Sequence, residues 1–161
     1  MLEQQHREVE ALFKKISRAR SDRSRAELFA EIGDKLTIHA TIEETHFYPA
    51  VLARRTEDIL LESLEEHLAI KRIIADLLDT EPSDETFKAK IKVLKEVVEH
   101  HVEEEEGDMF KKVPKVLDAD LREAVGQEMQ ATMAELQAKG NARFSVRSQT
   151  EEAAPLEGTD R

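Results

Sequence analysis

Two five-residue runs, each with a histidine four residues before a glutamate, are the part of this sequence best suited to chemistry. They are His39–Glu43 and His101–Glu105. Both lie in stretches whose apolar spacing predicts helix, and helical residues four apart leave the same face about one turn apart. Each run therefore offers an imidazole and a carboxylate to one side of a helix.

An isolated histidine precedes each run by 33 or 34 residues: His6 precedes the first run and His67 the second. A single histidine on an apolar stripe is usually an ordinary core residue. Four such histidines, two of them with a carboxylate one turn on, are a different case, because buried glutamate is rare unless it is paired or bound to metal. Imidazoles and carboxylates that converge from four helices suit a transition metal, and we expect non-haem iron.

Helical phase separates these six residues from their titratable neighbours. His100 falls off the stripe that carries His101 and is expected to flank the site or be exposed. His46 lies at the margin of its stripe and is a candidate supporting residue. Tyr48 is expected in the core, with a hydrogen bond to the site as the alternative. Four glutamates are expected to form a solvated acidic face: Glu44, Glu103, Glu104 and Glu106.

Apolar residues spaced by three and four predict the helices that must position these side chains. The expected ranges are 2–17, 26–48, 59–78, 85–110 and 120–139. A repeat offset by 61 or 62 residues relates the first two helices to the next two. Two helix pairs packed antiparallel bury their apolar stripes in one core. The expected fold is all-α: an up-down four-helix bundle with an appended fifth helix over residues 1–140, and a polar, disordered tail over residues 141–161.

Composition excludes several other classes of protein. The chain has 161 residues and no cysteine, so disulfides, thiolate metal sites and iron–sulfur clusters are excluded. A net charge of −11 argues against nucleic acid as a partner. No apolar run approaches the roughly 20 residues that cross a bilayer, and no secretory signal is evident, so we expect a cytoplasmic protein without membrane contact.

Over residues 1–136 the sequence closely resembles the hemerythrin-like family, the HHE cation-binding domain. The resemblance rests on the two runs, on the isolated histidines, and on the strings 43–49 and 105–110. It implies a bundle that encloses two oxo- or hydroxo-bridged irons, with Glu43 and Glu105 bridging the irons and His6, His39, His67 and His101 capping them. Ferritin-type bundles are disfavoured because they use Glu-x-x-His instead.

One position departs from the family pattern. Oxygen-carrying hemerythrins have a further histidine four residues after the one that matches His67, and this sequence has Lys71 there. Lysine is a poor iron ligand because its ammonium must first lose a proton. Glu10 is the counterpart of Lys71 in the repeat. We expect the two residues to approach each other near the site, or Glu10 itself to bind iron.

The leading hypothesis is a non-haem di-iron protein that binds or reacts with O2, NO or H2O2, with peroxide or nitric oxide detoxification as a role. The loss of a histidine at Lys71 favours reaction or sensing over oxygen carriage, but the sequence leaves open whether the protein is an enzyme. No catalytic residue distinct from the metal site is expected. The alternative is an iron, oxygen or redox sensor that acts through a protein partner, which the 120–139 helix and the tail would face. A metal-free structural bundle is disfavoured, because six interior polar residues would then need other partners.

Overall fold

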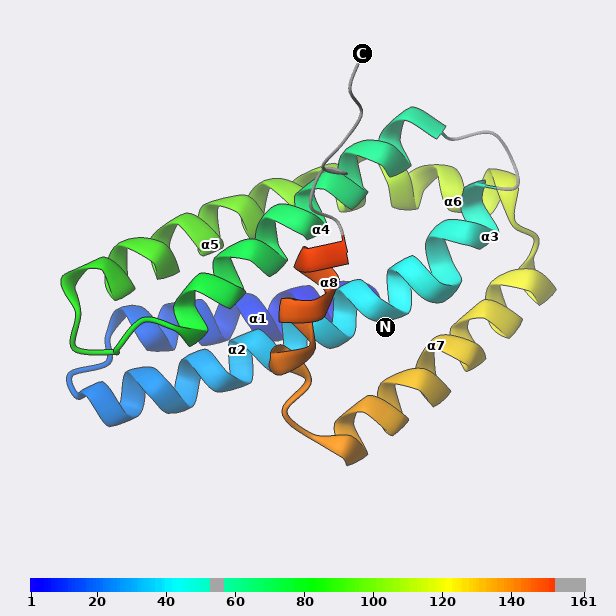
Figure 1. Ribbon diagram of the computed structural model, residues 1–161. Coiled ribbons are helices and arrows are strands. Elements are labelled where there is room, and N and C mark those ends of the chain that lie inside the picture. The colour runs from blue at the N-terminus through cyan, green and yellow to red at the C-terminus, as the bar shows by residue number, and fades with distance from the viewer. Residues whose placement is uncertain (53–56, 153–161) are drawn as a thin grey trace, which may run out of the picture.

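The computed structural model describes residues 1–52 and 57–152, and every regular element in these ranges is helical. Four long helices lie side by side in the bundle (Figure 1). They are α1 (Leu2–Ser17), α2 (Asp22–Ile42), α4 (Glu57–Leu78) and α5 (Glu85–Glu104). The short connection between α1 and α2, and that between α4 and α5, make each pair antiparallel, as the sequence predicted.

Two π-helical segments interrupt the bundle at equivalent positions of the repeat. One, Glu43–Phe47, follows α2 and leads into α3 (Tyr48–Leu52). The other, Glu105–Met109, follows α5 and leads into α6 (Phe110–Val116). The helices thus extend beyond the predicted ends at residues 48 and 110, and Pro49 lies within the first turn of α3. A π-helical turn closes hydrogen bonds five residues apart, and such turns are frequent at functional sites.

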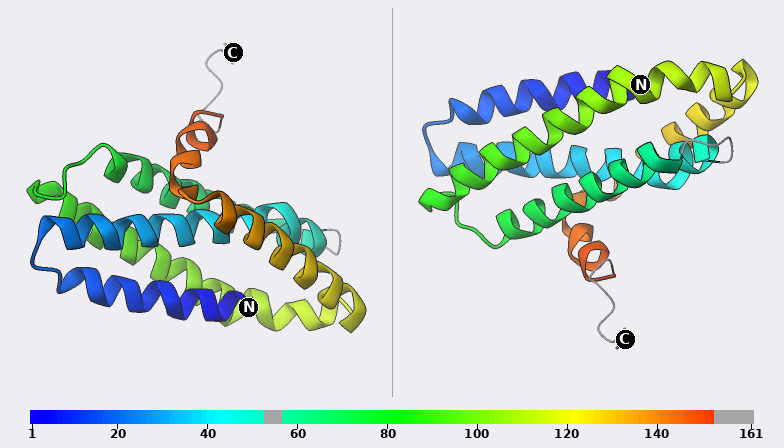
Figure 2. Two further views of the ribbon diagram at one scale, coloured as in Figure 1. Left: turned by 90° about the horizontal axis from the view of Figure 1, so that it is seen from below. Right: turned by 90° about the horizontal axis from the view of Figure 1, so that it is seen from above.

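The helix starts follow from capping side chains. The hydroxyl of Ser21 accepts a hydrogen bond from the backbone N–H of Ser24 at 3.1 Å, so α2 begins at Asp22, four residues before the predicted start. Asp84 caps α5 by accepting from the N–H of Thr86 at 2.8 Å. The next long helix, α7 (Ala119–Lys139), lies outside the bundle and packs against α2 (Figure 2).

The apolar core is divided into two clusters. One is formed by residues such as Leu12, Phe87 and Leu94. The other lies toward the π-helical segments, around Ile42 and Met129. On α1, His6 lies between Leu2, which packs on the second cluster, and Val9 of the first. On α2, His39 lies between Leu36 of the first cluster and Ile42 of the second. Buried apolar residues therefore enclose the site from both ends.

The expectation of a disordered tail is wrong for residues 142–152. A 3-10 turn, Ala142–Ser145, and a helix, α8 (Val146–Glu152), follow α7. The Val146 side chain is fully buried in the first core cluster, and the Arg143 guanidinium donates to the Asp34 carboxylate at 2.9 Å. Gly140, with φ of +69°, ends α7 at the reversal of the chain. The rest of the predicted tail, 153–161, lies outside the described residues.

Within residues 1–52 and 57–152, no helix combines the length and the apolar composition that crossing a bilayer requires.

Candidate metal centre

The structure brings all six predicted ligand residues together in the middle of the bundle. Each comes from the helix on which the sequence placed it, and the two glutamates open the two π-helical segments. All six are buried, and both glutamates are 0% exposed: His6, His39, Glu43, His67, His101 and Glu105.

The four imidazoles form two facing pairs. The Nε2 atoms of His6 and His39 lie 3.2 Å apart, and so do the Nε2 atoms of His67 and His101. Each pair joins the two helices of one half of the repeat. Two nitrogen ligands from each half thus point into a common interior.

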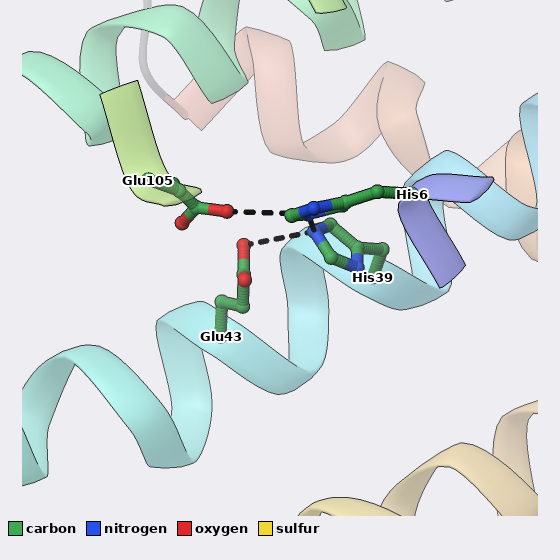
Figure 3. Close-up of side chains that lie close together, drawn as sticks. All are labelled: His6, His39, Glu43 and Glu105. Carbon is green, nitrogen blue, oxygen red and sulfur yellow. Dashed lines mark hydrogen bonds and ion pairs between the residues drawn. The ribbon is translucent and has the colours of Figure 1, made fainter. Parts of the chain in front are cut away.

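Each buried carboxylate contacts both histidine pairs. Oε2 of Glu43 lies 3.3 Å from His39 Nε2 and 3.2 Å from His67 Nε2. Oε2 of Glu105 lies 3.3 Å from His6 Nε2 and 3.5 Å from His101 Nε2. Figure 3 shows Glu43 and Glu105 pointing toward the first pair of histidines. Two carboxylates placed between two pairs of imidazoles can each link the two halves.

This donor set fits metal ions. The ligand atoms form two close groups, one of His6, His39, Glu43 and Glu105 and the other of Glu43, His67 and His101, each within 4.8 Å. Oε1 of Glu43 and Oε2 of Glu105 are buried and have no hydrogen-bond donor among the described residues. A buried carboxylate oxygen without a donor is costly, and a bound cation removes that cost.

Two glutamates that the sequence analysis assigned to a solvated face support the centre instead, so that assignment is wrong for them. His67 Nδ1 lies 2.9 Å from Glu44 Oε1, and His6 Nδ1 lies 2.8 Å from Glu106 Oε1. A carboxylate that accepts from Nδ1–H fixes the ring and leaves Nε2 free for a metal. The signal was present in the repeat, which aligns Glu44 with Glu106 directly after Glu43 and Glu105.

The other two histidines are supported in the same way, by residues that the sequence analysis missed. His39 Nδ1 lies 2.6 Å from Gln5 Oε1, and His101 Nδ1 lies 2.7 Å from Glu66 Oε2. Gln5 and Glu66 are also equivalent in the repeat, each one residue before an isolated histidine. All four rings therefore have their outer nitrogen held by a side-chain oxygen.

Lys71 belongs to this supporting set, but Glu10 does not. The Lys71 side chain is buried, and its Nζ donates to both oxygens of Glu44 at 2.7 Å. The predicted approach of Glu10 to Lys71 is not found, because the Glu10 oxygens pair with Arg7 and Lys14 on the bundle surface. Among the described residues, the contact that links Lys71 to the centre is the Glu44 carboxylate, which also holds His67.

Tyr48 takes both of the roles considered for it. Its side chain is buried, and its hydroxyl donates to Glu105 Oε1 at 2.8 Å and lies 3.3 Å from Glu43 Oε2. In an α-helix, residue i+5 points well away from residue i, but a π-helical turn brings it back toward the same face. The segment Glu43–Phe47 therefore turns Tyr48 into the site, and its ring stacks on His67 at 5.3 Å.

His46 lies away from the centre. Its Nε2 is 2.7 Å from the Thr132 hydroxyl, and its Nδ1 is 3.5 Å from Glu128, both on α7. The prediction of His46 as a supporting residue of the site therefore fails, and it connects the π-helical segment to the outer helix. His100 is 60% exposed in its side chain and flanks the site, as expected.

The buried groups shift one another's pKa in opposite directions. Burial lowers the pKa of His39 to about 3. Burial also opposes the charged form of His101, but hydrogen bonds to Glu43 and Glu66 raise its pKa to about 10. Burial, together with the neighbouring Glu43 charge, raises the pKa of Glu105, whereas the histidines outweigh burial at Glu43 and hold its pKa well below its ordinary value. Because metal ligands must give up their protons, such a site binds cations in a pH-dependent way.

A small cavity adjoins the imidazoles on the side of the first core cluster. Its volume is about 20 Å³, and a water molecule needs about 10–15 Å³. Its apolar lining comes from all four long helices: Val9, Leu36, Ala40, Ile70, Val98 and Val102. A cavity of this size and lining admits a molecule of a few atoms and excludes larger ones.

Comparisons with known proteins agree with this geometry. Residues 1–113 match the family model described as Hemerythrin HHE cation binding domain. A crystal structure of a hemerythrin HHE cation-binding domain-containing protein from Mycobacterium kansasii superposes with a TM-score of 0.74 at 31% identity, covering 94% of this chain and 93% of that one. A protein from Nostoc sp. named DNA nickase is 28% identical over 132 residues, which are 82% of this chain but only 38% of that protein.

Proposed function

Because this chain belongs to the hemerythrin HHE cation-binding domain family, we propose that its buried centre holds two iron ions that bind or react with O2, NO or H2O2. The ligands would be the four histidines of the two pairs together with Glu43 and Glu105. The observation that carries the proposal is that both buried glutamates contact both histidine pairs. An iron pair supplies open coordination positions and reversible redox chemistry.

The chain's own residues would orient the ligands and limit access to them. The four Nδ1 hydrogen bonds fix the imidazole rings, and the Tyr48 hydroxyl holds one oxygen of Glu105. Tyr48 is the one hydroxyl donor shared by the two site carboxylates among the described contacts, so it is placed to give or hold a proton there. The cavity of about 20 Å³ favours diatomic ligands and peroxide over larger substrates.

Metal analysis combined with the visible spectrum, before and after H2O2 is added, tests the proposal. Two irons per chain and rapid loss of peroxide support a reactive centre. The same iron content without peroxide loss supports binding of O2 or NO at that centre. Absence of bound iron after anaerobic reconstitution with Fe²⁺ would refute the site.

A matched pair of variants separates the site from the acidic surface. Glu43→Gln removes a buried carboxylate that contacts both histidine pairs, and Glu103→Gln makes the same change at an exposed position of α5. We expect Glu43→Gln to lose at least one iron per chain, because its oxygen lies between the two pairs. Glu103→Gln is expected to keep both irons, and equal iron loss in the two variants would contradict the assignment.

A sensor acting through a protein partner is the second candidate, and one contact favours it. His46, three residues after Glu43 in the same π-helical segment, is hydrogen-bonded to Thr132 of the outer helix α7. A change at Glu43 could therefore be passed to α7. Hydrogen exchange measured with and without iron tests this: slower exchange of the α7 amides on iron binding supports sensing, and unchanged exchange argues against it.

DNA nicking is not part of this proposal. This chain spans 38% of the length of the protein that carries that name, and its net charge is −11. An acidic protein repels the phosphate backbone. A supercoiled plasmid incubated with the iron-loaded protein is expected to stay supercoiled.

A further inference from the structure

A second group of metal-ligating side chains lies on the outer face of the bundle, over α4 and α5. Glu62 and Glu66 are one turn apart on α4, and His100 and Glu104 are one turn apart on α5. One ligand atom from each residue lies within 4.8 Å of those of the other three. None of the four belongs to the ligand set of the buried centre.

The side chains already converge on a common point. His100 Nε2 lies 3.3 Å from Glu66 Oε1 and 3.3 Å from Glu104 Oε1. Glu66 is the inner member of the group, with 11% of its side chain exposed. Its Oε2 accepts from His101, whereas its Oε1 is buried, makes no hydrogen bond among the described residues and faces the His100 imidazole at ion-pair distance. One buried oxygen of Glu66 is therefore directed at the exterior group.

The net negative charge of the group favours binding of a cation. It contains three carboxylates, and in the described part of the chain no lysine or arginine forms an ion pair with any of them. Like charges this close repel one another. The imidazole of His100 sets the group apart from a plain acidic patch, because mixed nitrogen and oxygen ligands favour divalent transition metals over Mg²⁺ and Ca²⁺.

We propose that Glu62, Glu66, His100 and Glu104 form an exterior site for one divalent transition-metal ion, separate from the buried centre. The site draws two ligands from each of two neighbouring helices. Its solvent-facing side, where His100 is 60% and Glu104 32% exposed, leaves room for water ligands. The site adjoins the buried centre at Glu66, whose Oε2 accepts from His101, but it shares no proposed ligand residue with that centre.

Zn²⁺ titration of the full-length, iron-loaded protein, followed by calorimetry, tests the proposal. We expect one further Zn²⁺ per chain, with iron content unchanged by metal analysis. His100→Ala and Glu104→Gln are expected to weaken this binding at least tenfold, because each removes a ligand at the surface. Glu103→Gln is the control, since it removes the same charge from the same turn of α5 without touching the group. Glu66 is left intact because it also supports His101.

The outcomes separate this site from the proposed function. If the buried centre takes up no iron, metal-free wild type should still bind one more Zn²⁺ than metal-free His100→Ala. The same Zn²⁺ affinity in wild type, His100→Ala and Glu103→Gln would overturn the proposal and assign the binding to diffuse acidic charge. Absence of any saturable Zn²⁺ binding beyond the buried centre would overturn it as well.

Discussion

Replacing Lys71 by methionine tests whether the buried lysine stabilises the fold through Glu44. Lys71 Nζ lies 2.7 Å from both oxygens of Glu44, and the two side chains are 7% and 28% exposed. Exposed ion pairs contribute about 0.2–1 kcal/mol, and breaking a fully buried pair costs about 3–5 kcal/mol. This pair lies between these limits, so we expect Lys71→Met to lower the free energy of unfolding by about 2 kcal/mol.

The assay is urea unfolding of the chelator-treated protein at pH 7, where metal binding does not contribute. Lys35→Met is the matched control: Lys35 Nζ lies 2.8 Å from Glu8, but these side chains are 33% and 40% exposed. We expect Lys35→Met to lower the free energy of unfolding by less than about 1 kcal/mol. For a chain of this size, a loss of about 2 kcal/mol should also lower Tm by roughly 4–8 °C.

A double-mutant cycle with Glu44→Gln isolates the pair itself. If the ion pair carries the effect, the coupling energy between the Lys71 and Glu44 positions should exceed about 1 kcal/mol, and the double variant should lose less than the sum of the single losses. If Lys71→Met lowers the free energy of unfolding no more than Lys35→Met does, the buried lysine does not stabilise the fold. If the losses at Lys71 and Glu44 are additive, the ion pair between them is not the source of the effect.

Three further predictions concern the core, the helix caps and the metal. Leu94→Ala, at a fully buried position of the first core cluster, should lower the free energy of unfolding, measured in urea, by about 2–5 kcal/mol. Val93→Ala truncates an exposed side chain, and an equal loss in the two variants would contradict the core assignment. Hydrogen bonds from Thr86 lower the pKa of Asp84, so the cap should stabilise α5 above the unfolded pKa and lose that effect as pH falls through the folded pKa. The gap in urea midpoint between wild type and Asp84→Ala should accordingly be present at pH 7 and close in acid; a gap that does not change with pH would rule out the charged cap. Iron at 100 times its dissociation constant should stabilise the protein by about 2.7 kcal/mol, and an unchanged Tm would argue against binding to the folded state.

The sequence predicted the long helices and the meeting of six side chains because both follow from one regularity. A period of 3.6 residues fixes which residues share a face, and the repeat fixes which faces meet. The placement of His6, His39, His67 and His101 needed nothing more. The predicted helix starts were less accurate where a capping side chain sets the first residue of the helix, as Ser21 does for α2.

The π-helical segments could not be read from that regularity, and they change which residues near the site share a face. A pattern based on α-helical phase treats residues after Glu43 and Glu105 as if the helix continued unchanged. The wider turn instead brings Tyr48 onto the face of Glu43. Glu44 was placed in solvent for a different reason. Its partners, His67 and Lys71, come from another helix, and the pattern of one helix does not contain them.

The segment after α7 shows the same limit. Residues 142–152 have no apolar period, so the sequence predicted disorder there. Their structure depends on tertiary contacts: Val146 is buried in the bundle core, and Arg143 pairs with Asp34 of α2. One buried valine and two ion pairs, the second between Arg147 and Asp79 of the segment after α4, are not a periodic signal, although together they dock residues 142–152 on the bundle.

The two halves of the repeat supply equivalent histidines and glutamates to the centre, but the side chains that hold the outer ring nitrogens differ between the halves. This difference bears on the chemistry of the centre. At equivalent positions, His39 donates to the neutral amide of Gln5 and His101 donates to the carboxylate of Glu66. An anionic acceptor makes an imidazole a more basic ligand. Both histidines of the second half, His67 and His101, donate to carboxylates, whereas in the first half only His6 does. The second half of the repeat therefore offers a cation the more electron-rich pair of histidines. Two metal ions held by such a centre would differ in affinity, although the residues that bind them are the same in kind.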